Sequence, residues 1–293
     1  MKTQSWQLEA AAYPFSIRFN PHYSHLDTER HVNNVAVQSF HTESRTRFHM
    51  AVLGEDVWYS DDVLLRPRRT VTHFLRETHY PHEVTAAVRV VAVESDRYRL
   101  VQALFQHDQC VGVQECLMGA WHQGAWVPLP DSVQRTLQGE VGEPPSLLPW
   151  PDLNEDDAGI RRYPQKVDLK ARYADLDPDR CLAELAVARY MEQSRAGSLN
   201  MLRLPGLGLL VARIDIRYLR WDAGMGEVAL HSGLAGIGNT SFVLRGGARV
   251  DDTLVAVSES VMVLMDREAR RPTPVTGPLR ESMAELIVDG APA

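Results

Sequence analysis

The sequence YSHLDTERHVNNVAVQSFHTESRTR, residues 23–47, decides how the rest of the chain is interpreted. A related sequence, YADLDPDRCLAELAVARYMEQSRAG, begins 150 residues later, at Tyr173. Gapless agreement over such a length indicates a duplicated domain. The identical pairs at this offset are Tyr23 and Tyr173, Leu26 and Leu176, Asp27 and Asp177, Arg30 and Arg180, Ala36 and Ala186, Val37 and Val187, Ser44 and Ser194, and Arg45 and Arg195.

The length and charge of the chain agree with this interpretation. The chain has 293 residues, 44% of them hydrophobic, and a formal net charge of -7. At roughly 150 residues per domain, two domains are expected, and each is long enough to bury a hydrophobic core. We expect no nucleic-acid partner, because phosphate binding needs a concentrated basic surface.

The cysteines and the apolar runs predict the compartment. The three cysteines, Cys110, Cys116 and Cys181, form no CxxC pair, so neither a disulfide framework nor a zinc site is predicted. Reduced thiols suit a cytoplasmic protein. The N-terminal residues lack a long apolar segment, so no signal peptide is expected. No apolar run reaches some eighteen residues, so neither a spanning helix nor a membrane partner is expected.

The first half predicts a strand, a loop, a long helix and a meander of strands. Residues 14–20 alternate apolar and polar side chains, as a strand does. Asn33 or Asn34 can cap a helix that continues to about Leu53, and Gly54 ends it. Three or four strands with short polar breaks follow, at residues 63–77, 83–94, 97–107 and 110–121. The helix carries a small-to-apolar stripe, formed by Val37, Phe40, Ser44, Phe48 and Ala51.

The second half repeats this order. A strand is predicted at residues 166–173 and a helix at 183–203, followed by strands near 209–219, 227–235, 241–250 and 254–265. Residues 131–165 are rich in proline and acidic side chains and predict a linker, with a short helix at 132–138. The predicted domains are therefore 1–130 and 166–293. Both belong to the α+β class, with an antiparallel sheet whose one apolar face is covered by one long helix.

The motif of the first copy resembles that of the hotdog-fold acyl-CoA and acyl-ACP thioesterases. Their pattern is near D-x-x-G/Q-H-V-N-N followed by a helix with E-x-R. Here the matching residues are Asp27, His31, Val32, Asn33, Asn34, Glu43 and Arg45. The resemblance covers two copies, roughly residues 10–130 and 160–285. It implies two tandem hotdog domains, each a long helix wrapped by an antiparallel sheet, paired as a pseudo-dimer with the acyl thioester bound between them.

The sequence departs from this pattern at two places. Arg30 stands where the family often has Gly or Gln, which predicts a different loop backbone. In the second copy, Cys181 and the three residues after it replace H-V-N-N, while Asp175 and Asp177 remain. That D-x-D form resembles the 4-hydroxybenzoyl-CoA thioesterase branch, whose second Asp is catalytic and corresponds to Asp177. The hydratase branch places its His five residues after its Asp, whereas His31 comes four after Asp27.

The resemblance implies a metal-free hydrolysis that needs no cofactor. Asp27 is the expected general base or nucleophile, and backbone amides around Asn34 and Val35 are the expected oxyanion hole. His31 is expected to orient Asp27 or the water, and Glu43 could point toward the same cleft. Asp177 is the corresponding carboxylate of a second site that has lost its His and Asn neighbours.

Each of these residues also has a structural interpretation. Asp27 could cap a turn, His31 could hold the loop by a hydrogen bond, and Asn33 or Asn34 could only cap the helix. Glu43 is spaced to pair with Arg47, and we favour that interpretation. The second site could be a degenerate copy.

Coenzyme A phosphates need cations, and the cluster Arg66, Arg68 and Arg69 could bind them, although a solvated strand face is the commoner case. We expect an acyl-CoA thioesterase of fatty acid metabolism. An acyl-ACP substrate and a non-catalytic acyl-binding protein remain alternatives, and a homodimer is left open. The chain's acidic balance slightly disfavours acyl-ACP, because acyl carrier proteins are themselves acidic.

Overall fold

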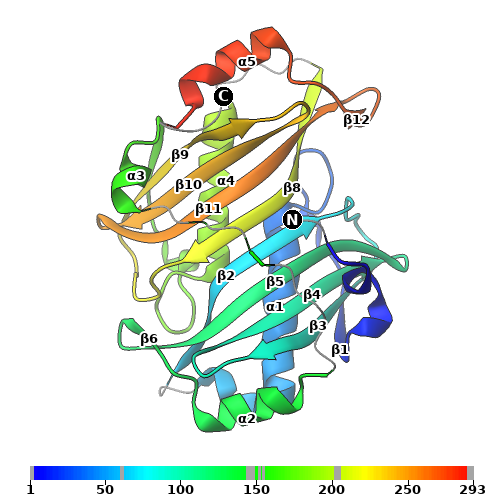
Figure 1. The fold of residues 1–293 in the computed structure, drawn as a ribbon, viewed down its shortest axis with the longest axis vertical. Helices are drawn as coiled ribbons and strands as arrows, with labels where there is room; N and C mark the ends of the chain where they lie inside the picture. The colour runs from blue at the N-terminus through cyan, green and yellow to red at the C-terminus, as the bar shows by residue number, and fades with distance from the viewer. Residues whose placement is uncertain are drawn as a thin grey trace. The chain divides into compact units, whose positions relative to one another are not determined.

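The computed structural model describes residues 3–59, 63–142, 149–150, 153, 156–200 and 206–288. The chain divides into two compact units, Met1–Pro151 (unit 1) and Asp152–Ala293 (unit 2). Each unit contains one long helix and one antiparallel sheet (Figure 1). This is the repeated α+β organisation that the sequence predicts.

Unit 1 follows the predicted order closely. Its helix α1 spans Asn34–Leu53 and ends at Gly54, whose φ of 104° is accessible to glycine at low cost. The sheet order is β1-β3-β4-β5-β2, with β6 paired to β5. The strands are β1 Phe15–Phe19, β2 Leu64–Phe74, β3 Val84–Val93, β4 Arg97–Gln106, β5 Gln109–His122 and β6 Ala125–Val127. The short helices are η1 Ser5–Leu8, η2 Ala10–Ala12, η3 Tyr23–His25, η4 Glu55–Tyr59 and α2 Asp131–Gly139.

Unit 2 repeats the arrangement. Its long helix α4 spans Glu184–Asn200; the rest of the predicted helix, residues 201–203, lies outside the described residues. The sheet order is β8-β11-β10-β9-β7, with β12 paired to β11. The strands are β7 Gln165–Lys170, β8 Leu207–Tyr218, β9 Glu227–Ile237, β10 Ser241–Val250, β11 Thr253–Asp266 and β12 Arg271–Pro272. The short helices are α3 Asp157–Arg161, η5 Tyr173–Asp175, α5 Gly277–Met283 and η6 Ala284–Leu286.

Residues 131–165, for which the sequence predicts a linker, contribute to both units. The predicted short helix is α2, and its Leu137 is completely buried in the core of unit 1. Helix α3 buries Ile160 in the core of unit 2. Residues 143–148, 151–152 and 154–155 of this stretch lie outside the described residues. The apolar side chains of α2 and α3 explain why these two helices pack onto the sheets.

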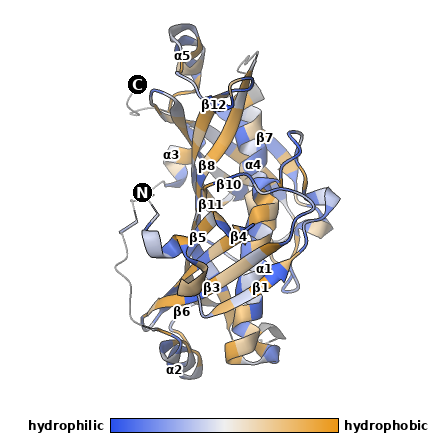
Figure 2. Ribbon diagram, turned by 90° about the vertical axis from the view of Figure 1, so that its right-hand side faces the viewer, coloured by the Kyte–Doolittle hydropathy of each residue, from blue (hydrophilic) through white to orange (hydrophobic). Residues whose placement is uncertain are grey.

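Helix α1 contacts its sheet through an apolar cluster at each end and a polar region between them. Phe40 belongs to one cluster and Phe48 to the other. Between them, Gln102 of β4 donates from Nε2 to the His41 carbonyl at 2.6 Å and to Ser44 Oγ at 3.0 Å. The buried polar residues of α1 are Gln38, His41, Ser44, Arg45 and His49. Figure 2 shows this mixture of hydrophilic and hydrophobic residues along the helix.

Two predictions about packing are wrong. Ala51, placed in the buried stripe of the helix, is exposed; it lies in the last turn of α1, which ends at Leu53. The sheet of unit 1 also has two apolar faces rather than one. The face opposite α1 is covered by the N-terminal residues, which place Trp6, Ala12 and Tyr13 against Val101 and neighbouring strand residues.

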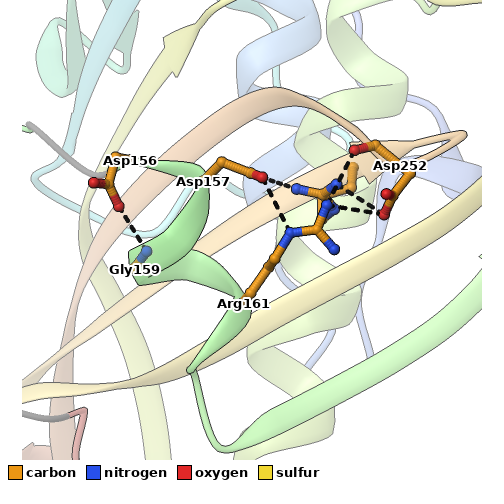
Figure 3. A network of polar contacts seen from close by, with 6 residues as sticks. Asp156, Asp157, Gly159, Arg161 and Asp252 are labelled. Atoms are coloured by element: carbon orange, nitrogen blue, oxygen red, sulfur yellow. Dashed lines mark hydrogen bonds and ion pairs between the residues drawn. The ribbon is translucent and has the colours of Figure 1, made fainter.

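In unit 2, α3 covers the face of the sheet opposite α4. Ion pairs hold α3 on that face. Arg249 of β10 is only 1% exposed and pairs with Asp157 at the start of α3. Its Nη2 also lies 2.8 Å from Asp252 Oδ1. Arg161 of α3 contacts the same two carboxylates at 3.0 Å each, and Asp156 caps the helix by accepting the Gly159 N–H at 2.6 Å (Figure 3). A buried guanidinium therefore holds α3 on the sheet.

Replacing Asp157 with alanine should lower the free energy of unfolding by about 2 kcal/mol, because it removes one carboxylate from a buried guanidinium. Urea denaturation of the full chain measures this. The control is Asp168→Ala, which removes an exposed carboxylate that pairs with Lys166 at 3.1 Å. We expect its effect to stay below about 0.5 kcal/mol. Equal effects of the two substitutions would contradict the role given to Arg249.

The buried histidines of α1 should make unit 1 sensitive to acid. Burial, together with nearby Arg45, lowers the pKa of both His41 and His49 to about 3, from 6.5. Below pH 6.5 these histidines are therefore protonated in the unfolded chain but stay neutral in the folded chain. The free energy of unfolding therefore falls as the pH falls. Between pH 6.5 and the lowered pKa, each of the two histidines should lower the free energy of unfolding by about 1.4 kcal/mol per pH unit.

Urea denaturation at pH 7.5 and pH 5.5 checks this sensitivity. The His41→Gln variant removes one of the two titrating groups, so its loss of stability between these pH values should be smaller than that of the unsubstituted chain. An unchanged difference would show that His41 does not titrate as its burial requires.

Candidate active site

The turn before α1 is built around the carboxylate of Asp27. Asp27 Oδ1 accepts hydrogen bonds from the backbone N–H groups of Glu29 at 2.9 Å and His31 at 3.0 Å. The Asp27 N–H donates in turn to the His31 carbonyl at 2.9 Å. Arg30 takes a left-handed conformation with a φ of 65°. Glycine adopts that conformation readily, which gives a physical reason why the related motifs often have Gly there.

Helix α1 begins directly after this turn. Asn33 is the N-cap, and its Oδ1 accepts the Val35 N–H at 2.7 Å. Asn34 is the first residue of the helix. The sequence left open which asparagine is the cap, and it named the amides near Asn34 and Val35 as the oxyanion hole. Of these two expected donors, the Val35 N–H already donates to Asn33 Oδ1.

The residues just after β2 bring a second carboxylate to this turn. The Val32 N–H donates to the Thr78 carbonyl at 2.9 Å and joins the two segments. Glu77 Oε2 lies 3.4 Å from His31 Nε2 and 3.8 Å from His79 Nε2. All three side chains are partly exposed, at 24% for His31, 27% for Glu77 and 49% for His79.

Glu77 and His79 are absent from the residues that the sequence singles out. In the sequence, the residues after the predicted strand, THYPH, indicate only a polar break between strands. One signal was available: a Glu ends the predicted strand, and two His lie in the break that follows, where the chain turns back in a hairpin. Sequence spacing alone could not place this break beside the Asp27 turn, because the two segments are about fifty residues apart in the chain.

The second copy keeps the turn and loses the side chains around it. Asp177 Oδ1 accepts the N–H groups of Asp179 at 3.0 Å and Cys181 at 3.1 Å, and Arg180 has a φ of 63°. Cys181 stands where the first copy has His31. The Leu182 N–H donates to the Ala223 carbonyl, as the Val32 N–H does to the Thr78 carbonyl. Asp222, the residue before Ala223, pairs with Arg220. Unit 2 therefore has the backbone of the site without its imidazole.

Asp175, the other acid of the D-x-D sequence, has a structural environment. Its side chain is 1% exposed and contacts Arg172 at 2.9 Å and the Tyr190 hydroxyl at 3.1 Å. Burial alone would raise the pKa of this carboxyl, but the hydrogen bonds from Arg172 and Tyr190 lower it overall. Asp175 therefore stabilises the approach to α4 as an anion.

The remaining predicted residues have partners away from the turn. Glu43 forms the predicted ion pair with Arg47, at 2.8 Å. Arg68 pairs with Asp96 at 3.0 Å and lies over the Trp126 ring, and Arg69 lies over the Trp150 ring. Arg66 is partly buried on the same strand. A role of Arg66, Arg68 and Arg69 in phosphate binding stays a prediction.

Comparison with known proteins rests on structure. No protein-family model matches the sequence, and no curated protein matches it. A protein assigned as an oleoyl thioesterase from Lactobacillus plantarum superimposes with a TM-score of 0.68 and 16% identity, over 86% of this chain and 95% of that chain. The 12:0-ACP thioesterase from Umbellularia californica superimposes with a TM-score of 0.71 and 12% identity, over 88% of this chain and 94% of that chain.

An acyl-ACP thioesterase from Bacteroides thetaiotaomicron gives a TM-score of 0.64 with 12% identity, over 85% of this chain and 97% of that chain. The fold is a tandem hotdog. The Asp27 turn thus lies between the first strand and the long helix of the first hotdog domain, and the Asp177 turn lies at the same place in the second. Among the described helices of both hotdog domains, none is long and apolar enough to cross a membrane.

The turn of the second hotdog domain should depend on Asp177 for stability. Asp177→Ala removes the acceptor of two backbone N–H groups and should lower the free energy of unfolding by about 1–2 kcal/mol. Asp177→Asn keeps an oxygen that can accept these N–H groups, so it should lower the free energy of unfolding by less. Urea denaturation of both variants measures the difference, and equal losses would show that the carboxylate does not hold the turn.

Proposed function

We propose that this chain is a cytoplasmic acyl thioester hydrolase whose active site is the Asp27 turn of the first hotdog domain. The observation that carries the proposal is the meeting of two carboxylates, one imidazole and a helix N-terminus there. Asp27, His31 and Asn34 come from the predicted motif, and Glu77 comes from the segment after β2. The tandem hotdog fold, shared with thioesterases of known structure, supports the same reaction class.

Asp27 is the proposed working carboxylate. Its Oδ1 is held by two backbone donors, while no described residue hydrogen bonds to Oδ2. As a general base, Oδ2 takes a proton from water as the water oxygen bonds to the thioester carbon. The carbon–sulfur bond then breaks and the thiolate leaves. Since ordinary thiols have a pKa of about 8.5, the thiolate needs little acid assistance. Direct attack by Asp27 on the carbonyl is the alternative, with water hydrolysing the resulting anhydride.

The other residues support this step. The Asn34 amide, at the positive end of the helix α1 dipole, is the proposed donor to the oxyanion that forms on the carbonyl. His31 is proposed to position the attacking water, and Glu77, 3.4 Å from Nε2, to fix the orientation of the imidazole. This gives Glu77 a positioning role that the sequence did not reveal.

Two acyl carriers fit the proposal. The motif of residues 27–34 resembles acyl-CoA and acyl-ACP thioesterases alike. The tandem proteins of known structure that cover most of this chain include two acyl-ACP thioesterases, which favours acyl-ACP as much as the sequence favoured acyl-CoA. Both carriers therefore belong in the same assay.

The alternative from a different class is a non-catalytic acyl-binding protein. Its support is the second copy, where Cys181 replaces the imidazole and Asp177 serves the turn. Tight binding of an acyl-CoA or acyl-ACP without release of free thiol would select this alternative.

The decisive experiment compares Asp27→Asn with Asp177→Asn. Asparagine retains the acceptor that each turn needs but cannot act as a base. Asp27→Asn should lower kcat at least about 100-fold, whereas Asp177→Asn should leave kcat within about twofold. Release of free thiol from a panel of acyl-CoAs and acyl-ACPs of different chain lengths measures both variants.

Full activity of Asp27→Asn, or no thiol release by the unsubstituted chain from any substrate, would reject the hydrolase proposal. A large loss in Asp177→Asn with normal folding would move the active site to the second hotdog domain.

A further inference from the structure

The histidines of this chain are distributed unevenly. Ten of the eleven lie in unit 1, and His231 is the exception. Two of the ten, His31 and His79, have rings whose centroids are 5.5 Å apart in an edge-to-face arrangement. Glu77 contacts both of them. The hydrolysis proposed above uses His31 and Glu77 but gives no role to His79.

We propose that His31, Glu77 and His79 form a binding site for one zinc ion or a similar transition-metal dication. Their ligating atoms all lie within 4.8 Å of one another. Two imidazoles with one carboxylate are a ligand set that zinc takes in open sites, where water or a substrate atom completes the coordination. Magnesium and calcium are disfavoured, because they prefer oxygen ligands to imidazole.

Two of the three distances between the ligating atoms are close to the values that zinc needs. Zinc holds nitrogen and oxygen ligands at about 2.0–2.2 Å, so neighbouring ligands of a tetrahedral ion lie about 3.3–3.6 Å apart. The separation of 3.4 Å between His31 Nε2 and Glu77 Oε2 already meets this value. The separation of 3.8 Å between Glu77 and His79 needs a contraction of a few tenths of an ångström, which side-chain rotation can supply.

The backbone at each histidine is fixed without a metal. His31 exchanges hydrogen bonds with Asp27 through both its N–H and its carbonyl. The His79 N–H donates to Gln106 Oε1 at 2.9 Å, and Gln106 Nε2 donates to the His79 carbonyl at 2.8 Å. Gln106 is itself buried in β4. The three ligands therefore lie on two segments, which the hydrogen bond from the Val32 N–H to the Thr78 carbonyl holds side by side.

Binding and its consequence can be separated. The site follows from the arrangement of the three side chains and does not depend on the hydrolase proposal. Its consequence does rest on that proposal: zinc bound there would occupy the imidazole of His31 and the carboxylate of Glu77 and would inhibit hydrolysis. Free zinc would then act as an inhibitor of the first site.

Isothermal titration calorimetry tests the site directly, with the full chain freed of any affinity tag and treated with a chelator. Zinc chloride titrated at pH 7.5 should bind with one ion per chain at this site. His79→Ala and Glu77→Gln should each weaken that binding at least about tenfold, because loss of a ligand exceeds the loss of a second-shell contact.

The matched control is His107→Ala, which removes another histidine of unit 1 whose ring lies 4.6 Å from that of His82. Its zinc affinity should stay within about twofold of the unsubstituted chain. Absence of zinc binding, or equal losses in His107→Ala and His79→Ala, would overturn the site. Circular dichroism checks the fold of each variant, and His79→Gln replaces His79→Ala if the latter does not fold.

Thiol release with and without zinc then tests the consequence. If zinc inhibits the unsubstituted chain, and His79→Ala weakens both zinc binding and inhibition, the consequence is supported. Zinc binding without inhibition would keep the metal site and would count against a role of His31 and Glu77 in hydrolysis.

Discussion

The carboxylate of Asp27 sets the position of everything around it. By accepting two backbone N–H groups, it closes the turn that carries His31 to the start of α1 and brings Val32 beside the segment after β2. The same bonds recur at Asp177, where no imidazole remains. Survival of the carboxylate in both copies is therefore explained by the backbone alone. The copies differ at His31, which Cys181 replaces, and at Glu77, whose counterpart Asp222 pairs with Arg220.

Most of the fold could be predicted from the sequence, because each element has a strong local signal. Asn33, Gly54 and the alternating strands fix the elements of the first half, and the 150-residue offset carries them to the second. The packing of α1 could not be predicted in the same way. The helix buries the polar residues Gln38, His41, Arg45 and His49, which its hydropathy does not predict. The facing Gln102, Tyr98 and Cys116 are partners that satisfy part of this polarity.

Sequence motifs could name only part of the candidate site, for a similar reason. Asp27, His31 and Asn34 are neighbours along the chain, so a motif reveals them together. Glu77 and His79 reach the turn through strand pairing and the contact between Val32 and Thr78, which depend on tertiary structure. The ion pair of Glu43 with Arg47 could be predicted, because the i,i+4 spacing is a local signal, and the pair is present.

The two sheets are covered on their outer faces by different means, although both covers precede the first strand of their unit. Unit 1 uses aromatic and apolar side chains, with Tyr13 donating to the Gln7 carbonyl at 2.7 Å. Unit 2 uses α3, held through Arg249. An ancestral gene segment copied only from the first strand onward would have left the second sheet with a bare hydrophobic surface. Either the copied segment included its leader, or the second half acquired a leader of its own that adds ion pairs to the apolar contacts of Ile160.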